Sequence, residues 1–191
     1  MNYLALLPIK ERLHCRRVAA VSKMLADAAG LSAVEADSVE RAAILHDVGK
    51  AALPQELLCQ DRPLSARQQT AFRSHAELGM RLLRETEGVL STASIVALQH
   101  HERLDGSGYY GLTEQAIHPH AKLVAAADVF DTAVFCGTAE VEQGLVRACL
   151  ILVKEGGQTL SQEHTHFLLS HLDDVMVACE AINAHNPSSV H

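Results

Sequence analysis

The sequence predicts an all-α fold, a helical bundle of six or more helices, and three observations support this prediction. Apolar residues make up 48% of the 191 residues, whereas aromatic residues make up only 4% and Trp is absent. The core must therefore be built from Leu, Val, Ala and Ile, and a chain rich in Ala and Leu favours helices over strands. Apolar residues also recur at helical spacing, and two apolar runs follow capping boxes.

The first half of the chain divides into helices at recognisable start and stop signals. A first helix is expected over 9–29, where a glycine ends it. A capping box opens a second helix over 32–50, and another opens a third helix over 65–85. The apolar segment 88–101 predicts the next helix.

The second half begins with a glycine-rich loop over 102–118. A proline suited to the first turn of a helix then opens a helix over 119–135. Two further helices are expected over 138–155 and 161–183, separated by a pair of glycines.

The length of the chain favours one domain. Size scaling predicts that about 70% of the surface of the unfolded chain is buried, which supports one sizeable core. We find neither an internal repeat nor a low-complexity linker. Residues 1–185 are therefore expected to form a single domain, and the polar residues 186–191 a frayed tail.

Composition also limits the partners and the compartment. The net charge is −7 and no basic face is evident, which argues against binding to a nucleic acid duplex. An acidic chain can still bind a phosphoester when bound cations supply the positive field. No stretch is apolar enough to span a membrane. The five cysteines are widely spread and form no C-x-x-C pair, and the N-terminus makes a poor signal peptide, so a cytoplasmic location is expected.

Asp47 and Asp128 each lie in an apolar stretch of a predicted helix. A buried unpaired carboxylate is costly, so each acid has to be paired, hydrogen-bonded or bound to a metal. No Lys or Arg lies one turn either side of Asp128, and a further acid at Asp131 increases the electrostatic cost. Taken alone, either Asp47 or Asp128 could be a hydrogen-bonded core acid.

Several histidines lie in similar apolar settings. His46 directly precedes the first of these acids, and His100 and His101 end another apolar helix where the loop begins. Neighbouring helical residues point about 100° apart, so both imidazoles reach one centre only at a frayed helix end. The alternative is that one binds metal and the other donates to a carboxylate. His14 and His75, taken singly, are more typical of core or surface histidines than of metal ligands.

Together, five histidines and two aspartates form a long-range set of nitrogen and oxygen ligands. Their spacing is not that of a zinc finger, and they are too many for one tetrahedral ion. The set therefore predicts two cations bridged by a carboxylate, and it suits iron, manganese, nickel or zinc rather than calcium. The predicted ligands are His14, His46, Asp47, His75, His100, His101 and Asp128. The histidines without a place in this set are interpreted as surface or structural: His118, His120, His164, His166, His171, His185 and His191.

Five motifs in a fixed order carry a resemblance to a known family, and they span about residues 10–135. The chain resembles the HD superfamily of metal-dependent phosphohydrolases, and within it the HD-GYP subfamily, the bacterial cyclic di-GMP phosphodiesterases. The motifs are HCRRV at 14–18, HDVGK at 46–50, HAELG at 75–79, HHERLDGSGY at 100–109 and ADVFD at 127–131.

The resemblance implies an all-α HD-domain bundle with a metal centre between its helices. It implies that Asp47 bridges two divalent ions, with iron or manganese as the expected metal and nickel, zinc or magnesium as alternatives. The implied ligands of the first ion are His14, His46, Asp47 and Asp128, and those of the second are Asp47, His75, His100 and His101.

The resemblance also implies how a substrate is bound and cleaved. Two-metal logic implies in-line attack of a water on phosphorus. Asp47 and Lys50 are the implied catalytic residues, with Lys50 contacting the phosphate or protonating the leaving group; the alternative is a solvated lysine at a helix C-terminus. Lys50, Gly106, Gly108 and Tyr109 are the implied substrate contacts, because glycines let the backbone approach a ligand. The alternative is a plain surface loop.

The sequence departs from the subfamily pattern at several positions. Tyr110 replaces the subfamily's proline, giving Gly-Tyr-Tyr, and Lys10 stands where some members have a glutamate that supports a third metal. The usual basic position after the HDxGK motif is Gln60, and no basic residue follows Asp131 before Arg147. Intact metal chemistry with weakened substrate capture is therefore expected.

The sequence thus predicts a phosphodiesterase that hydrolyses a cyclic dinucleotide, with cyclic di-GMP as the first expectation, to a linear product. One alternative is an HD phosphohydrolase acting on another nucleotide or phosphoester. The other is a non-catalytic signalling or binding module with a vestigial metal site. The expected partners are the dinucleotide and a signalling protein reached through the Gly-Tyr-Tyr loop; the sequence does not predict the oligomeric state.

Overall fold

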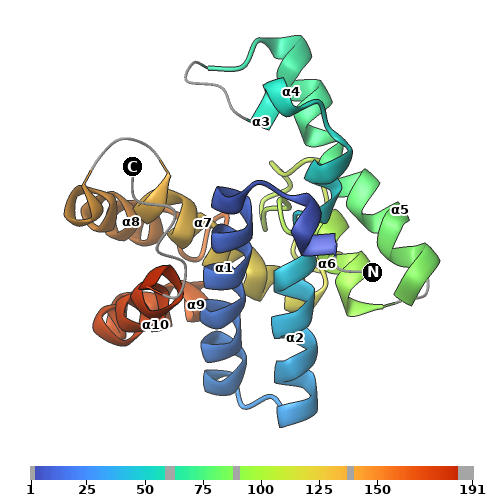
Figure 1. Cartoon of the computed structure of the whole chain (residues 1–191). Coiled ribbons are helices and arrows are strands. Elements are labelled where there is room, and N and C mark those ends of the chain that lie inside the picture. Colours follow the sequence, from blue (N-terminus) through green and yellow to red (C-terminus); the bar gives the residue numbers. More distant parts are fainter. Residues whose placement is uncertain (1–2, 59–62, 88–90, 137–139, 185–191) are drawn as a thin grey trace.

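The computed structural model describes residues 3–58, 63–87, 91–136 and 140–184. These residues form helices joined by turns and loops, with isolated bridges but no extended strand among them, so the predicted all-α bundle is confirmed (Figure 1). In chain order the elements are η1 (Tyr3–Leu6), α1 (Ile9–Ala28), α2 (Ala33–Leu45), η2 (Val48–Ala52), α3 (Gln55–Leu58), α4 (Ala66–Arg73), α5 (His75–Glu87), α6 (Thr92–Gln99), α7 (Pro119–Phe135), α8 (Val141–Glu155), α9 (Gln162–Ser170) and α10 (Leu172–Ala184), where η marks a 3-10 helix.

Helices α1 and α7 form the centre of the fold. α1 packs against α2, α7, α9 and α10, and α7 also packs against α6 and α8. In Figure 1, α2 lies on one side of α1 and α9 and α10 lie on the other. Leu123, Val124 and Phe130 of α7 are almost fully buried, and alanines fill the positions between them. Small side chains there allow neighbouring helices to approach closely, so the core is aliphatic, as the composition predicts.

The predicted helix starts coincide with the observed ones where a cap was recognised. The Ser32 side chain accepts from the Glu35 backbone N–H at the start of α2, and the Glu35 side chain accepts from the Ser32 backbone. Ser65 and Gln68 form the same capping box on α4. Pro119 occupies the first turn of α7. Local sequence therefore determines where these helices begin.

Two predicted helices are each split in the structure. The helix predicted over 65–85 is two helices that meet at Ser74, whose hydroxyl donates to the carbonyl of Ala71 at 2.7 Å. Such a side-chain bond competes with helical bonding. The helix predicted over 161–183 breaks at His171, where φ is −126° and ψ is 32°.

Other bounds also differ from the prediction. The second helix ends at Leu45, and the segment predicted to extend it to residue 50 forms a turn and η2. α6 begins at Thr92, and the start predicted at residue 88 lies outside the described residues. So do the start predicted at residue 138 and the tail at 186–191. The short helices η1 and α3 were not predicted.

Two glycines allow η2 to pack directly on α5. A Cβ atom at Gly49 would overlap the carbonyl oxygen of His75 and lie 2.5 Å from the backbone nitrogen of Gly79. A Cβ atom at Gly79 would in turn lie 3.2 Å from the Gly49 nitrogen. The absence of side chains here brings Asp47, which directly precedes η2, against His75.

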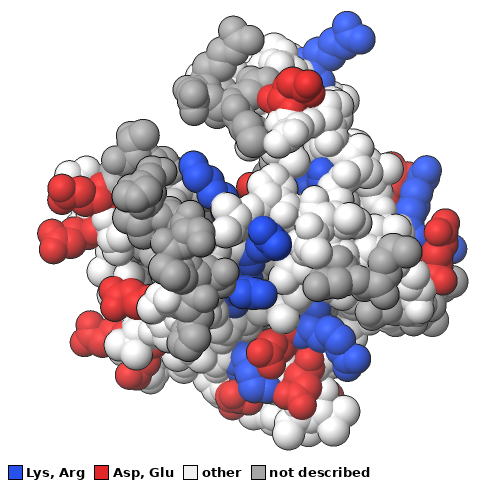
Figure 2. All heavy atoms as spheres, in the orientation of Figure 1, with Lys and Arg blue, Asp and Glu red and all other residues white. Residues whose placement is uncertain are grey.

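No helix within the described ranges is long and apolar enough to cross a membrane. Figure 2 shows the acidic side chains of the viewed face mainly over α8, over α10 and at the lower ends of α1 and α2. Lys and Arg side chains are scattered over the same face, from its upper and right edges to its centre, and do not form one patch.

Candidate metal centre

Asp47 lies at the centre of a buried cluster of histidines and acids. It follows His46, the C-cap of α2, and its side chain is 2% exposed. Helices α1, α5 and α7 and the end of α6 place further side chains around its carboxylate. All seven predicted metal ligands lie in this cluster, and all but His101 are buried.

One group of ligand atoms comes from α1, from the end of α2 and from α7. The Nε2 atom of His14 lies 3.2 Å from Asp128 Oδ1 and 3.5 Å from Asp47 Oδ2. The Nε2 atom of His46 lies 3.2 Å from Asp47 Oδ2. The ligand atoms of His14, His46 and Asp128 lie within 4.8 Å of one another, so this group has the size of a site for one cation.

A second group comes from α5 and from the end of α6. The Nε2 atoms of His75 and His100 lie 3.3 and 3.7 Å from Asp47 Oδ1. Ligand atoms of these three residues and of His101 lie within 4.8 Å of one another. His100 is the C-cap of α6, so the helix ends at the paired histidines. The predicted helix end that lets both imidazoles reach one centre is therefore observed. The two oxygens of Asp47 therefore face different groups, which is the geometry that a bridging carboxylate requires.

The Nδ1 atoms of three buried histidines bind backbone carbonyls. Because a carbonyl only accepts, each Nδ1 carries a hydrogen, and Nε2 is then the lone-pair atom of the neutral ring. The Nε2 atoms of His75 and His100 face each other at 3.4 Å. Within the cluster, His46 Nε2 and Asp47 Oδ1 are buried without a hydrogen-bond partner. Converging bare acceptors are what a cation satisfies, so the residues fit a metal centre. For His46, His75 and His100, the carbonyls belong to Ala43, Phe72 and Ala97, at 2.6, 2.7 and 3.0 Å.

The electrostatics of the cluster suit cation binding. Burial lowers the pKa of His75 to about 4 and that of His101 to about 2, so both rings are neutral at neutral pH, as ligands must be. Burial alone would raise the pKa of Asp47, but the charge of Lys50 and the surrounding imidazoles hold it well below its ordinary value. Burial alone would lower the pKa of His14, but hydrogen bonds to three aspartates raise it. The same carboxylates would attract a cation in place of that proton.

Cys15 also reaches the cluster, with its sulfur near the ligand atoms of His46 and Asp47. Burial raises the pKa of its thiol far above the ordinary value. A neutral thiol is a poor metal ligand, so Cys15 fits the core of α1 rather than the ligand set.

Asp131 orients His14 and is neutralised by Arg17. The Nδ1 atom of His14 donates to Asp131 Oδ2 at 2.7 Å, and Arg17 donates to both carboxylate oxygens at 2.6 and 2.9 Å. The expectation that Asp131 only increases the cost of burying Asp128 is therefore wrong. Arg17 lies one turn after His14 on α1 and so shares its face of the helix. That spacing was the only local sign that Arg17 and His14 contact the same partner. Arg17 also donates to Asn183 Oδ1 on α10 at 2.9 Å.

We expect Asp131→Asn to lower the affinity for Mn²⁺ by about 10–100-fold, the usual effect of removing a carboxylate that orients a histidine ligand. A metal titration of purified protein measures this effect. Asp174→Asn, at an exposed position of α10, is the matched control. Unchanged Mn²⁺ affinity in a folded Asp131→Asn protein would show that His14 needs no such support.

Lys50 lies within the cluster rather than in solvent. Its Nζ atom lies 2.6 Å from Asp47 Oδ2 and 2.7 Å from Glu11 Oε2, and its side chain is 12% exposed. The alternative of a solvated lysine therefore does not describe this residue. Glu11 had no predicted role, although it precedes His14 by three residues and so shares its face of α1.

Glu102 fixes the loop that follows the paired histidines. Its buried carboxylate accepts from the backbone N–H groups of Tyr110 and Leu112, both at 2.8 Å. A proline at position 110, as in the subfamily pattern, has no N–H and could not make the first bond. Tyr110 therefore gives the Gly-Tyr-Tyr loop a backbone hydrogen bond to Glu102 that a proline at this position could not make.

The implied substrate contacts lie in this loop beside the metal cluster. Gly106 has a φ of +82°, which favours glycine at that turn. A Cβ atom at Gly108 would lie 2.5 Å from the Cα of Glu102, so this glycine lets the loop pack on the end of α6. The Tyr109 ring packs on the ring of His101, with centroids 4.4 Å apart. Tyr109 is thus next to a predicted ligand, whereas Gly108 has a clear structural role.

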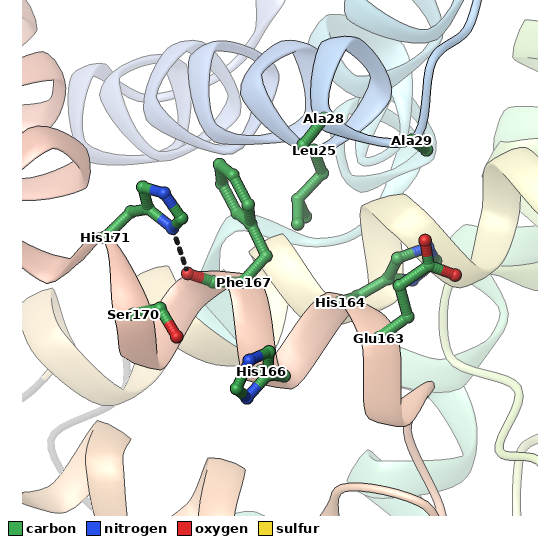
Figure 3. Close-up of a pocket in the computed structure, with 9 residues that line it drawn as sticks. All are labelled: Leu25, Ala28, Ala29, Glu163, His164, His166, Phe167, Ser170 and His171. Carbon is green, nitrogen blue, oxygen red and sulfur yellow. Dashed lines mark hydrogen bonds between the residues drawn. The ribbon is translucent and has the colours of Figure 1, made fainter.

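A second group of histidines lies around a cavity of about 220 Å³ between α1 and α9. Figure 3 shows that the rings of His164, His166 and His171 point in different directions around α9, with Phe167 between them. His171 binds the carbonyl of Phe167 through Nδ1 at 3.0 Å. These rings do not converge on one point, which agrees with their interpretation as surface or structural residues.

The fold and the cluster define a class of protein: a helical domain that holds a buried set of histidine and aspartate ligands suited to divalent cations. The HD-domain family profile matches residues 3–163, which include all seven predicted ligands. The chain belongs to the HD-domain family.

Relatives of the chain are named as cyclic dinucleotide phosphodiesterases. Over 117 residues the chain is 39% identical to the cyclic di-GMP phosphodiesterase response regulator RpfG of Xanthomonas campestris pv. campestris, covering 60% of this chain and 31% of that protein. Over 120 residues it is 38% identical to the 3'3'-cGAMP-specific phosphodiesterase 2 of Vibrio cholerae, covering 62% of this chain and 23% of that protein. The chain thus spans about a third or less of the length of these relatives.

Solved structures show the same fold. Bd1817 of Bdellovibrio bacteriovorus, described as an HDG"Y"P protein, matches with a TM-score of 0.70 and 22% identity, over 84% of this chain and 51% of that one. The PgpH HD domain of L. monocytogenes, in complex with cyclic-di-AMP, matches with a TM-score of 0.59 and 16% identity, over 100% of this chain and 98% of that one. At these identities the likeness concerns the fold alone.

Proposed function

We propose that this chain is a metal-dependent phosphodiesterase that hydrolyses a cyclic dinucleotide, with cyclic di-GMP as the preferred substrate, to a linear product. The observation that carries the proposal is the position of Asp47, whose two buried oxygens face two separate sets of imidazole ligands. The names of the relatives support the substrate class.

The centre is proposed to hold two divalent ions, iron or manganese, with nickel, zinc or magnesium as alternatives. When bound, such ions supply Lewis-acid stabilisation of the phosphoryl oxygens and lower the pKa of water. The ligands of the first ion are His14, His46, Asp47 and Asp128, and those of the second are Asp47, His75, His100 and His101.

The other roles belong to side chains around this cluster. Asp131 fixes the ring of His14 through Nδ1, and the backbone carbonyls fix three further rings, so the ligands need little reorganisation. The ammonium group of Lys50 lies beside Asp47 and is positioned to bind a phosphate oxygen or to protonate the leaving oxygen. Tyr109 borders the cluster through the ring of His101, and Gly106, Gly108 and Tyr109 are the proposed substrate contacts.

Hydrolysis of a small panel of substrates by the Mn²⁺- or Fe²⁺-loaded protein tests the proposal. We expect turnover of cyclic di-GMP, slower turnover of a mixed cyclic dinucleotide, and loss of both after treatment with a chelator. Turnover restricted to bis(p-nitrophenyl) phosphate or to another nucleotide would reject the cyclic dinucleotide substrate. A loaded protein that cleaves none of these substrates would instead support the non-catalytic module.

For Lys50→Gln we expect turnover to fall by about 100-fold, the lower end of the range for acid–base groups, while bound metal persists. The amide of glutamine keeps hydrogen-bond donors but loses the charge, on a side chain that is one bond shorter. Turnover and metal content are measured on the same preparation, with Lys23→Gln on the surface of α1 as the control. Unchanged turnover would reject a role for Lys50, and loss of metal would assign it to holding Asp47.

A further inference from the structure

A cavity of about 270 Å³ adjoins the metal cluster on the side of His101. It lies between the end of α4, the Gly-Tyr-Tyr loop and the turn between α8 and α9, and Leu104 is tied to that turn by a backbone bond to Thr159 at 3.0 Å. His101, which also lies 3.9 Å from Asp128, forms the wall shared with the cluster. The cavity and the cluster are therefore neighbours that share the His101 side chain.

Two arginines from separate parts of the chain line the cavity. The guanidinium of Arg73, at the end of α4, lies 5.0 Å from the centroid of the Tyr109 ring. Arg103 donates through one guanidinium nitrogen, Nη1, to the backbone carbonyls of Glu102 and His100 at 2.9 and 3.4 Å, which fixes the guanidinium at the end of α6, whereas Arg147 is held through both Nε and Nη2. The opposing acid, Glu155, accepts from the hydroxyl of Thr159 at 2.8 Å. Two guanidinium groups against one carboxylate leave the cavity with a net positive charge, which suits a phosphate.

These arginines provide positive charge that the segment after Asp131 lacks. The first basic residue in that segment is Arg147, and its guanidinium is engaged by the carbonyls of Ala133 and Cys136 at 2.6 and 3.2 Å. Arg147 therefore stabilises the end of α7 rather than a ligand. Arg73 and Arg103 lie beside a predicted metal ligand instead.

We propose that this cavity binds the second phosphodiester of the cyclic dinucleotide, the one not being hydrolysed, through Arg73 and Arg103. The proposal rests on the proposed function, because only a substrate with two phosphates occupies both places. A cyclic dinucleotide has one phosphate for the cluster and one for the cavity, and a simple phosphodiester has only the first. The two arginines are binding residues for the substrate rather than catalytic residues.

The test compares Arg73→Gln with Arg67→Gln, an exposed arginine on the same helix. For Arg73→Gln we expect the KM for cyclic di-GMP to rise by about tenfold, the loss of one charged hydrogen bond, with kcat within about threefold. The loss in kcat/KM should be about tenfold larger for cyclic di-GMP than for bis(p-nitrophenyl) phosphate. Arg73→Lys should recover part of the loss, because it restores the positive charge. Arg103→Lys keeps the charge but loses the planar guanidinium that binds two phosphate oxygens, so it should also raise the KM for cyclic di-GMP.

The outcomes separate this inference from the proposed function. If the wild-type protein hydrolyses cyclic di-GMP and Arg73→Gln behaves like Arg67→Gln, the cavity is not a phosphate site and only this inference fails. Equal losses for both substrates would place the effect at the cluster and would also overturn it. If the wild-type protein cleaves bis(p-nitrophenyl) phosphate but no cyclic dinucleotide, the proposed function fails and the inference fails with it.

Discussion

Replacing Asp47 by asparagine is expected to remove bound metal and turnover together. The two carboxylate oxygens lie 3.2 Å from His46 Nε2 and 3.3 Å from His75 Nε2, so one side chain serves both ligand groups. An amide loses the negative charge and presents N–H hydrogens on one side, where a cation needs a lone pair. We expect turnover to fall by roughly 10³-fold or more, exceeding the usual effect of removing one donor from a catalytic site.

Elemental analysis and cyclic di-GMP hydrolysis, measured on the same preparation, check this result. Asp37→Asn is a matched control, because Asp37 is exposed and pairs only with surface groups on the described part of the chain. Thermal melting shows whether the variant is folded. Full turnover in the Asp47→Asn protein would place the chemistry elsewhere in the molecule.

Gly49→Ala is expected to be the most destabilising of the conservative changes around the site. The added methyl group would overlap the carbonyl oxygen of His75, so η2 and α5 would have to separate. Overpacking of this kind lowers the free energy of unfolding by about 3 kcal/mol. The shift would also draw Asp47 away from His75, so we expect weaker metal binding in any protein that folds.

Urea denaturation followed by circular dichroism measures the loss of stability. Gly30→Ala is the control, because a Cβ atom at Gly30 has no neighbour within 4 Å and the cost arises only from its φ of +72°. We expect about 1 kcal/mol for that control. Equal effects of the two substitutions would show that the contact between η2 and α5 is not tightly packed.

Five of the seven cluster positions carry a local signal in the sequence, whereas His14 and His75, taken singly, do not. His46, Asp47 and Asp128 are polar residues in apolar runs, and His100 and His101 end such a run. Burying these groups requires compensation, and that requirement can be inferred without coordinates. The same reasoning gives the helix starts at Ser32 and Pro119, where capping chemistry is local.

The supporting contacts could not be predicted because their partners are distant in sequence. Arg17 and Asp131 are separated by 114 positions, and nothing near Asp131 shows where its counter-charge lies. Arg73 and Arg103 likewise meet at one cavity only after the chain has folded. The breaks at Ser74 and His171 were missed because neither position carries the glycine or proline that usually marks the end of a helix.

The link from Asn183 through Arg17 and Asp131 to His14 has a practical consequence for engineering this chain. α10 lies beyond residue 163, where the family match ends, yet one of its side chains binds the arginine that pairs with Asp131, the partner of the proposed metal ligand His14. A truncation designed from the family match alone would discard that helix. Any shortened version meant to retain metal should extend through residue 184.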